Sequence, residues 1–258
     1  NEGHEIFVVE MGAYNRGGIK LLCNIAHPKI GVLTGINEQH MATFGSQENI
    51  IKAKYELIES LPADGTAFFN GNNQYCRDLF EIAKIRKKLY GENASSSYEE
   101  NLAGAVAVAE FLGMNQESIG QGIQKIKLSQ ASRVKKGAGG IAIVDSTYSA
   151  NPSGVIADLD YLKQWSGKKV IVMPCLIELG KASKEVHQRI GKKIGEVCDL
   201  AIITTKDRLE EIREGAPNAL FVERADEIAE KIKSFCGPGD VVLLESRVPS
   251  QVVNLLIK

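Results

Sequence analysis

Three side chains in the first quarter of the chain could together hold a divalent cation and a phosphate group. Glu10 directly follows the apolar run Ile6–Val9, and His40 ends the polar turn after a second apolar run, Ile30–Thr34. Lys54 falls inside a segment with helical spacing. Magnesium prefers carboxylate and phosphate oxygens, and a neutral imidazole can also bind a metal. Because parallel α/β sheets bind ligands at the carboxyl ends of their strands, we expect these three side chains to meet in one crevice.

Each of these residues also has a plainer interpretation. Glu10 could cap a helix or form a salt bridge, and His40 could be a loop histidine with satisfied hydrogen bonds. Lys54 on its own is typical of a solvated helix lysine. In the same way we expect His187 to lie on a helix surface, and the Asn70–Asn73 loop to be only a turn.

The composition favours an ordinary globular protein. The chain has 258 residues, of which 44% are hydrophobic and 24% charged, with a net charge of −1. This balance gives no basic field for nucleic acid, and no apolar run is long enough to span a membrane. Five scattered cysteines without a C-x-x-C pair indicate free thiols in a reducing compartment, so we expect a cytoplasmic protein. The chain opens at Asn1, not methionine, so we expect it to be the later part of a longer protein.

Strand and helix patterns alternate along the first half of the chain. Apolar runs predict strands at Ile6–Val9, Ile30–Thr34 and Thr66–Asn70. A helix is predicted from Ser46 to Leu61, with Ser46 as its cap. The basic run Lys84–Lys88 fits either a strand or a solvated face.

The second half alternates more regularly. Five strand–helix units follow one another between residues 141 and 257, which predicts a mostly parallel sheet covered on both faces. The fold class is therefore α/β. The segment Lys127–Arg133 is the expected domain boundary, giving domains at 1–130 and 131–258.

Several short motifs, taken in order, resemble those of the Mur ligase family, the ATP-dependent amide-forming ligases of peptidoglycan precursor synthesis. Each motif is weak alone, but their order and spacing run through nearly the whole chain. They are Glu10-Met11-Gly12-Ala13, Gly31 to His40, Phe44-Gly45-Ser46, Ala53-Lys54-Tyr55-Glu56-Leu57, Asn101-Leu102-Ala103, Arg133, Asp145 to Pro152, and Glu178-Leu179-Gly180 with His187.

The resemblance implies a partial central, ATPase-type domain followed by a C-terminal Rossmann-like domain. It implies that Mg²⁺ is held by Glu10, His40 and a carbamylated Lys54, and that the catalytic residues are Lys54, His40 and Arg133. It further implies that ATP is bound by Asn101, Arg133, Asp145, Tyr148 and Asn151.

The implied reaction passes through an acyl phosphate, made when ATP phosphorylates a carboxylate, which an amine then attacks. The implied substrates are a UDP-muramoyl peptide and D-alanyl-D-alanine. The expected enzyme is a cytoplasmic monomer that needs ATP and Mg²⁺ and binds neither nucleic acid nor membrane.

The sequence departs from the family pattern in several places. The G-T-N-G-K-T-T phosphate loop and the domain for the UDP sugar are absent, so we expect this polypeptide alone to bind ATP weakly. Roughly fifty residues of central domain are missing between Asn73 and Asn101, judged from usual domain proportions. Cys175 replaces an aspartate, and Leu244 to Arg247 replaces K-G-S-R. Two alternatives stay open: a related ligase with another amine acceptor, and a non-catalytic binding module.

Overall fold

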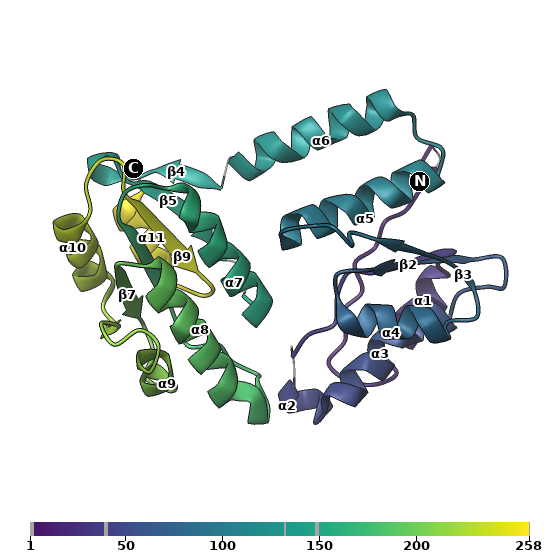
Figure 1. Cartoon of the computed structure of the whole chain (residues 1–258), viewed down its shortest axis with the longest axis horizontal. Coiled ribbons are helices and arrows are strands. Elements are labelled where there is room, and N and C mark those ends of the chain that lie inside the picture. Colours follow the sequence, from purple (N-terminus) through teal and green to yellow (C-terminus); the bar gives the residue numbers. More distant parts are fainter. Residues whose placement is uncertain (1–2, 39–40, 132, 148–149, 258) are drawn as a thin grey trace. The chain divides into compact units, whose positions relative to one another are not determined.

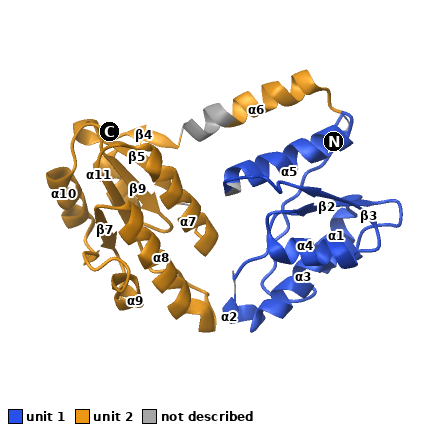
Figure 2. Cartoon of the chain, viewed as in Figure 1, with its two compact units in different colours: residues 1–113 blue, residues 114–258 orange. Residues whose placement is uncertain are grey.

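The computed structural model describes residues 3–38, 41–131, 133–147 and 150–257. The chain divides into two compact units, Asn1–Gly113 and Met114–Lys258 (Figure 2). Each is built around its own sheet. Over the described ranges, every helix is too short or too polar to cross a bilayer.

The first unit is a three-stranded parallel sheet with helices packed against it (Figure 1). The strand order is β1-β2-β3, and β2 is buried along its whole length because it lies between the other two. The strands are β1 (Ile30–Leu33), β2 (Thr66–Asn70) and β3 (Arg86–Tyr90). The helices are α1 (Gly18–Ala26), α2 (Met41–Phe44), α3 (Gln47–Glu59), α4 (Gln74–Ile82) and α5 (Ser97–Phe111).

The helix that carries Lys54 begins where the sequence predicts. The Ser46 side chain accepts a hydrogen bond from the backbone nitrogen of Asn49 at 3.2 Å and so caps α3. Ile50, Ala53 and Ile58 then face the core. Lys54 follows Ala53, so it lies at the edge of the buried face and is itself half-buried.

Two local predictions have different outcomes. The basic run at 84–88 contributes to a strand, β3, whose alternate residues are exposed, so the strand interpretation is confirmed. The strand predicted at Ile6–Val9 is wrong, because this segment joins no sheet and Phe7 and Val8 are 78% and 88% exposed. A strand needs a hydrogen-bonded neighbour, and among the described residues β1 pairs only with β2.

The second unit is a six-stranded sheet with the order β4-β5-β9-β6-β7-β8. Its strands are β4 (Val134–Lys136), β5 (Ala142–Ser146), β6 (Lys169–Met173), β7 (Leu200–Ile203), β8 (Leu220–Phe221) and β9 (Val241–Glu245). All neighbours are parallel except β4, which runs antiparallel at one edge. The mostly parallel sheet predicted from the five strand–helix units is therefore confirmed.

Helices cover both faces of this sheet, as the alternation of its buried side chains shows. Ile171 and Met173 of β6 belong to the core beneath α7 and α8, whereas Val170 and Val172 belong to the core beneath α10 and α11. The helices of the second unit are α6 (Gln116–Ala131), whose described residues belong to neither of these cores, and α7 (Pro152–Tyr161), α8 (Ser183–Val197), α9 (Leu209–Arg213), α10 (Ala225–Phe235) and α11 (Ser250–Leu256). Short 3₁₀ turns lie at 138–140, 162–164 and 180–182.

This winding leaves a crevice between two neighbouring strands. The chain leaves β5 for α7 on one face and leaves the adjacent β9 for α11 on the other. Ser146 and Glu245, the last residues of these strands, are paired in register. In open α/β sheets, ligands bind where neighbouring strands send their chains to opposite faces, so this edge is the expected binding place.

Candidate functional site

A pocket of about 570 Å³ opens at the carboxyl ends of β5 and β9. It brings together three of the residues that the sequence singled out, Arg133, Asp145 and Asn151. Tyr148, the fourth residue predicted for this site, lies outside the described residues. The remaining lining residues are Ser146, Thr147, Ala150, Gly154, Asp158 and Glu245.

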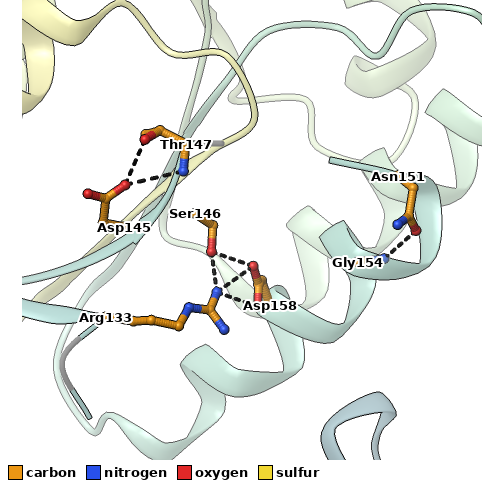
Figure 3. Close-up of polar contacts among 7 residues, drawn as sticks. All are labelled: Arg133, Asp145, Ser146, Thr147, Asn151, Gly154 and Asp158. Atoms are coloured by element: carbon orange, nitrogen blue, oxygen red, sulfur yellow. Dashed lines mark hydrogen bonds and ion pairs between the residues drawn. The ribbon is translucent and has the colours of Figure 1, made fainter. Parts of the chain in front are cut away.

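Arg133 is held against α7 by a bridge to Asp158. Its Nη2 donates to both carboxylate oxygens of Asp158, at 3.0 and 2.9 Å, and also to the Ser146 hydroxyl (Figure 3). Ser146 Oγ in turn donates to Asp158 Oδ2 at 2.6 Å. Within the described part of the chain, all side-chain hydrogen bonds of Arg133 use Nη2. The N–H groups of Nε and Nη1 can therefore still donate to the oxygens of an anion such as phosphate.

Asp145 lies on the other side of the pocket with a fixed orientation. Its Oδ1 accepts from the Thr147 backbone nitrogen and hydroxyl, at 3.2 and 2.8 Å (Figure 3), and its Oδ2 accepts from Lys135 Nζ at 2.6 Å. Burial acts to raise the pKa of Asp145, but the hydrogen bonds from Lys135 and Thr147 hold it below its ordinary value. Asp145 is therefore a carboxylate at neutral pH and an acceptor for ligand hydroxyl or amino groups.

Asn151 begins helix α7. Its Oδ1 accepts from the Gly154 backbone nitrogen at 2.9 Å (Figure 3). Pro152 follows in the first turn. Proline suits the first turn of a helix because its missing N–H would have no partner there in any case. The cap also places the positive end of the helix dipole at the pocket, which favours anionic groups.

Sequence reasoning missed Asp158 and Ser146 in this site. Asp158 lies seven residues after Asn151, which is about two helical turns, so both residues fall on the same face of α7. That spacing is a signal that could have identified Asp158. Ser146 directly follows Asp145, but nothing in its sequence context distinguishes it from any other strand-end serine.

In the first unit the structure describes two of the three residues predicted to bind metal. Glu10 is exposed, and Lys54 is half-buried on α3. Burial lowers the pKa of Lys54, while Cys76 and Glu10 act in the opposite direction. Burial raises the pKa of Cys76 to about 12, so this thiol is neutral at pH 7. His40 lies outside the described residues.

These surroundings bear on whether Lys54 suits a metal site. A half-buried lysine with a lowered pKa offers more of the neutral amine that carbon dioxide requires for carbamylation. A carbamate would supply an anionic oxygen beside the Glu10 carboxylate, which is the ligand chemistry of magnesium. Over the described ranges, histidine, cysteine, aspartate and glutamate alone form no cluster of three that could hold a metal.

The carboxyl edge of the first sheet is fixed by a polar network that the sequence did not reveal. Asn70 is 1% exposed, and its Nδ2 donates to the Thr34 carbonyl at 2.9 Å and to Glu100 Oε2 at 2.8 Å. Asn72 Nδ2 donates to Glu100 Oε1 at 2.7 Å. The loop after β2 is therefore more than the simple turn expected. Asn101, the residue predicted near adenine, follows Glu100 on α5 and is exposed.

His187 is buried, not on a helix surface as expected. It is 0% exposed; its Nε2 accepts from the Leu176 backbone nitrogen at 2.9 Å, and its Nδ1 lies 2.6 Å from the Ser183 carbonyl oxygen. The proton must then be on Nδ1. Burial is the main cause that lowers the pKa of His187, so the ring is neutral and fixes the loop after β6.

Two family models cover nearly the whole chain. The model of the Mur ligase middle domain matches residues 1–129, and that of the Mur ligase glutamate ligase domain matches residues 132–247.

Curated relatives point the same way at low identity. The UDP-N-acetylmuramoyl-tripeptide--D-alanyl-D-alanine ligase of Bacillus subtilis is 25% identical, over 95% of this chain and 62% of the relative. The ligase of the same name from Synechocystis is 26% identical, over 94% of this chain and 60% of the relative. The chain thus spans about 60% of the length of these relatives.

Solved structures show the same fold. The MurF ligase of Thermotoga maritima, solved in complex with ADP, matches 99% of this chain and 67% of its own, with a TM-score of 0.81 and 23% identity. A MurF structure from Acinetobacter baumannii matches 99% of this chain and 65% of its own, with a TM-score of 0.83 and 22% identity.

Proposed function

This chain belongs to the Mur ligase family, and we propose that the protein joins D-alanyl-D-alanine to a UDP-N-acetylmuramoyl tripeptide at the cost of ATP. The observation that carries the proposal is the pocket at the ends of β5 and β9, where Arg133, Asp145 and Asn151 lie together. The two curated relatives carry the name of this ligase. A cytoplasmic, monomeric enzyme with domains at 1–130 and 131–258 is part of the same proposal.

The residues of the pocket have distinct tasks in nucleotide binding. Arg133, anchored by Asp158, uses its remaining N–H groups to bind phosphate oxygens. Asp145 accepts hydrogen bonds from ribose hydroxyls or base amino groups, because its own orientation is fixed by Lys135 and Thr147. Asn151 lines the pocket and caps α7. Tyr148 would bind the nucleotide at the same site.

Residues of the first unit would supply the metal. Glu10, His40 and a carbamylated Lys54 would hold Mg²⁺, which neutralises phosphate charge when it is bound. Burial of Lys54 supports this role because it favours the neutral amine from which a carbamate forms. Asn101 on α5 would lie beside the adenine.

The proposed reaction consists of two successive displacement steps. A carboxylate oxygen of the muramoyl peptide attacks the γ-phosphorus of ATP, which forms an acyl phosphate and releases ADP. The amine of the incoming dipeptide then attacks the acyl carbon, and the tetrahedral intermediate expels phosphate as the amide forms. Charge neutralisation by Arg133 and precise positioning carry most of such catalysis.

The direct test uses the protein from its complete reading frame with ATP, Mg²⁺, the UDP-muramoyl tripeptide and D-alanyl-D-alanine. We expect ADP, phosphate and the pentapeptide product in equal amounts by mass spectrometry, and no product when Arg133 is replaced by alanine. ADP release with another amine but not with D-alanyl-D-alanine would identify a different acceptor. Failure to consume ATP with any amine would favour a non-catalytic binding module.

A further inference from the structure

Glu245 is a buried carboxyl group in the pocket whose role the proposed reaction leaves open. It is the last residue of β9, is paired in register with Ser146, and is 2% exposed. Glutamate is almost never buried to this extent unless a partner compensates its charge. Its Oε2 has no hydrogen-bond partner among the residues that the structure describes.

The cations of the pocket are already paired with other carboxylates. Arg133 Nη2 bridges both oxygens of Asp158 on α7, and Lys135 of β4 binds Asp145 of β5. No cation that the structure describes at this pocket remains for Glu245. A glutamate that is buried without a cation of its own ionises only at a large cost, because burial disfavours the charged form.

We propose that Glu245 is an uncharged carboxylic acid which keeps Asp158 on Arg133 and thereby positions Arg133 for an anionic ligand. It is a positioning residue, because it acts through Asp158 and does not itself bind phosphate. The inference rests on the proposed function only in taking the ligand to be a nucleotide.

The electrostatic surroundings agree with this assignment. Burial, followed by the negative charge of Asp158 and a hydrogen bond with it, raises the pKa of Glu245 to about 9, against the opposing effect of Arg133. Above that pH an ionised Glu245 competes with Asp158 for Arg133. The guanidinium then loses its fixed orientation, and ligand binding should decline.

The test compares variants that separate charge from hydrogen bonding. Glu245→Gln keeps the shape, stays neutral and retains an N–H donor for Asp158. Glu245→Leu is neutral but has no donor. Glu210→Gln changes the same functional group at an exposed position of helix α9 and serves as the control. Binding of ADP with Mg²⁺ to the whole chain is followed by NMR titration between pH 6 and 10.

We expect the affinity of Glu245→Gln for ADP at pH 7 to lie within about threefold of that of the unmodified chain. Its affinity should not decline near pH 9. We expect Glu245→Leu to bind about tenfold more weakly, which corresponds to the loss of about one hydrogen bond. An alkaline decline that persists in Glu245→Gln, or equal binding by Glu245→Leu, would overturn the proposal.

A second measurement separates this inference from the proposed function. The ¹³C resonance of the Glu245 carboxyl, assigned by its absence in Glu245→Gln, is titrated without ligand. A midpoint far above the ordinary range of glutamate supports the uncharged acid, and a midpoint near pH 4 to 5 overturns it. If no variant binds ADP, the nucleotide proposal fails, while this titration still decides the charge state of Glu245.

Discussion

Nη2 of Arg133 lies 3.0 and 2.9 Å from the two carboxylate oxygens of Asp158, so one guanidinium nitrogen bridges the whole carboxylate. The side chain of Arg133 is 33% exposed and that of Asp158 is 18% exposed. A partly exposed ion pair of this kind adds little to stability. Its main effect is to fix the direction in which the rest of the guanidinium points.

Replacing Arg133 with lysine should therefore weaken nucleotide binding while leaving the fold intact. Lysine keeps the charge but has a single nitrogen, so it lacks the separate, rigidly directed N–H groups with which arginine can hold Asp158 and contact phosphate. We expect affinity for ADP with Mg²⁺ to fall about tenfold or more, measured by NMR titration. Arg224→Lys is the control, since Arg224 pairs with Asp226 on the surface. Equal affinities for the two variants would refute this role of Arg133.

Lys54 should form a carbamate more readily than Lys52, the other lysine of α3. Burial lowers its pKa, so a larger fraction is the neutral amine at a given pH. With ¹³C-labelled bicarbonate we expect one carbamate resonance, which disappears in Lys54→Arg and persists in Lys52→Arg. Lys52 pairs with Glu48 on the exposed face of the same helix. A resonance that survives Lys54→Arg would place the modification elsewhere.

His187 should make stability depend on pH below neutrality. Its pKa is lowered in the folded chain, so the unfolded chain binds the proton more readily. Stability from this group is fully present above the unfolded pKa of about 6.5 and is lost as pH falls towards the folded value, by at most about 1.4 kcal/mol per pH unit.

Urea unfolding between pH 5 and 8 measures this effect. We expect the free energy of unfolding to depend less steeply on pH in His187→Gln than in the unmodified chain. The same variant should lose about 1–3 kcal/mol of that free energy at pH 7.5, because the hydrogen bonds to Leu176 and Ser183 are lost or strained. His4→Gln, at an exposed position, should keep the slope. If the free energy of unfolding varied with pH in the same way in the unmodified chain and in both variants, another group would be responsible for the pH dependence.

Close packing between α8 and α9 requires glycine at position 191. A Cβ at Gly191 would lie 2.2 Å from the Ile212 carbonyl oxygen, whereas a Cβ at Gly120 on α6 would meet no atom within 4 Å. We expect Gly191→Ala to lower the free energy of unfolding by about 1–3 kcal/mol or more. Gly120→Ala should instead be neutral or stabilise by up to about 1 kcal/mol. The midpoints of denaturant unfolding measure both effects. Equal midpoints for Gly191→Ala and Gly120→Ala would contradict the packing argument.

The elements themselves were largely predictable from the sequence, because they depend on local patterns. Spacing over a few residues is enough to predict the Ser46 cap, the five strand–helix units and the helix start at Asn151. The family motifs likewise pointed to Arg133 and Asp145. The two predictions that were wrong concern features that depend on distant parts of the chain. Ile6–Val9 has the composition of a strand but no neighbour to bond with in the described structure, and His187 has no local signal that it is buried.

Only the tertiary structure decided how the pocket is made. Glu245 lies about a hundred positions after Ser146, and the two become neighbours because β9 inserts between β5 and β6. Strand order depends on which helices cover which face, a long-range packing outcome that no short window of sequence records. The sequence therefore determined which groups could do chemistry, and the fold decided that a buried carboxyl group, Glu245, lines the same pocket as the Arg133–Asp158 pair, since such neighbours depend on distance in space.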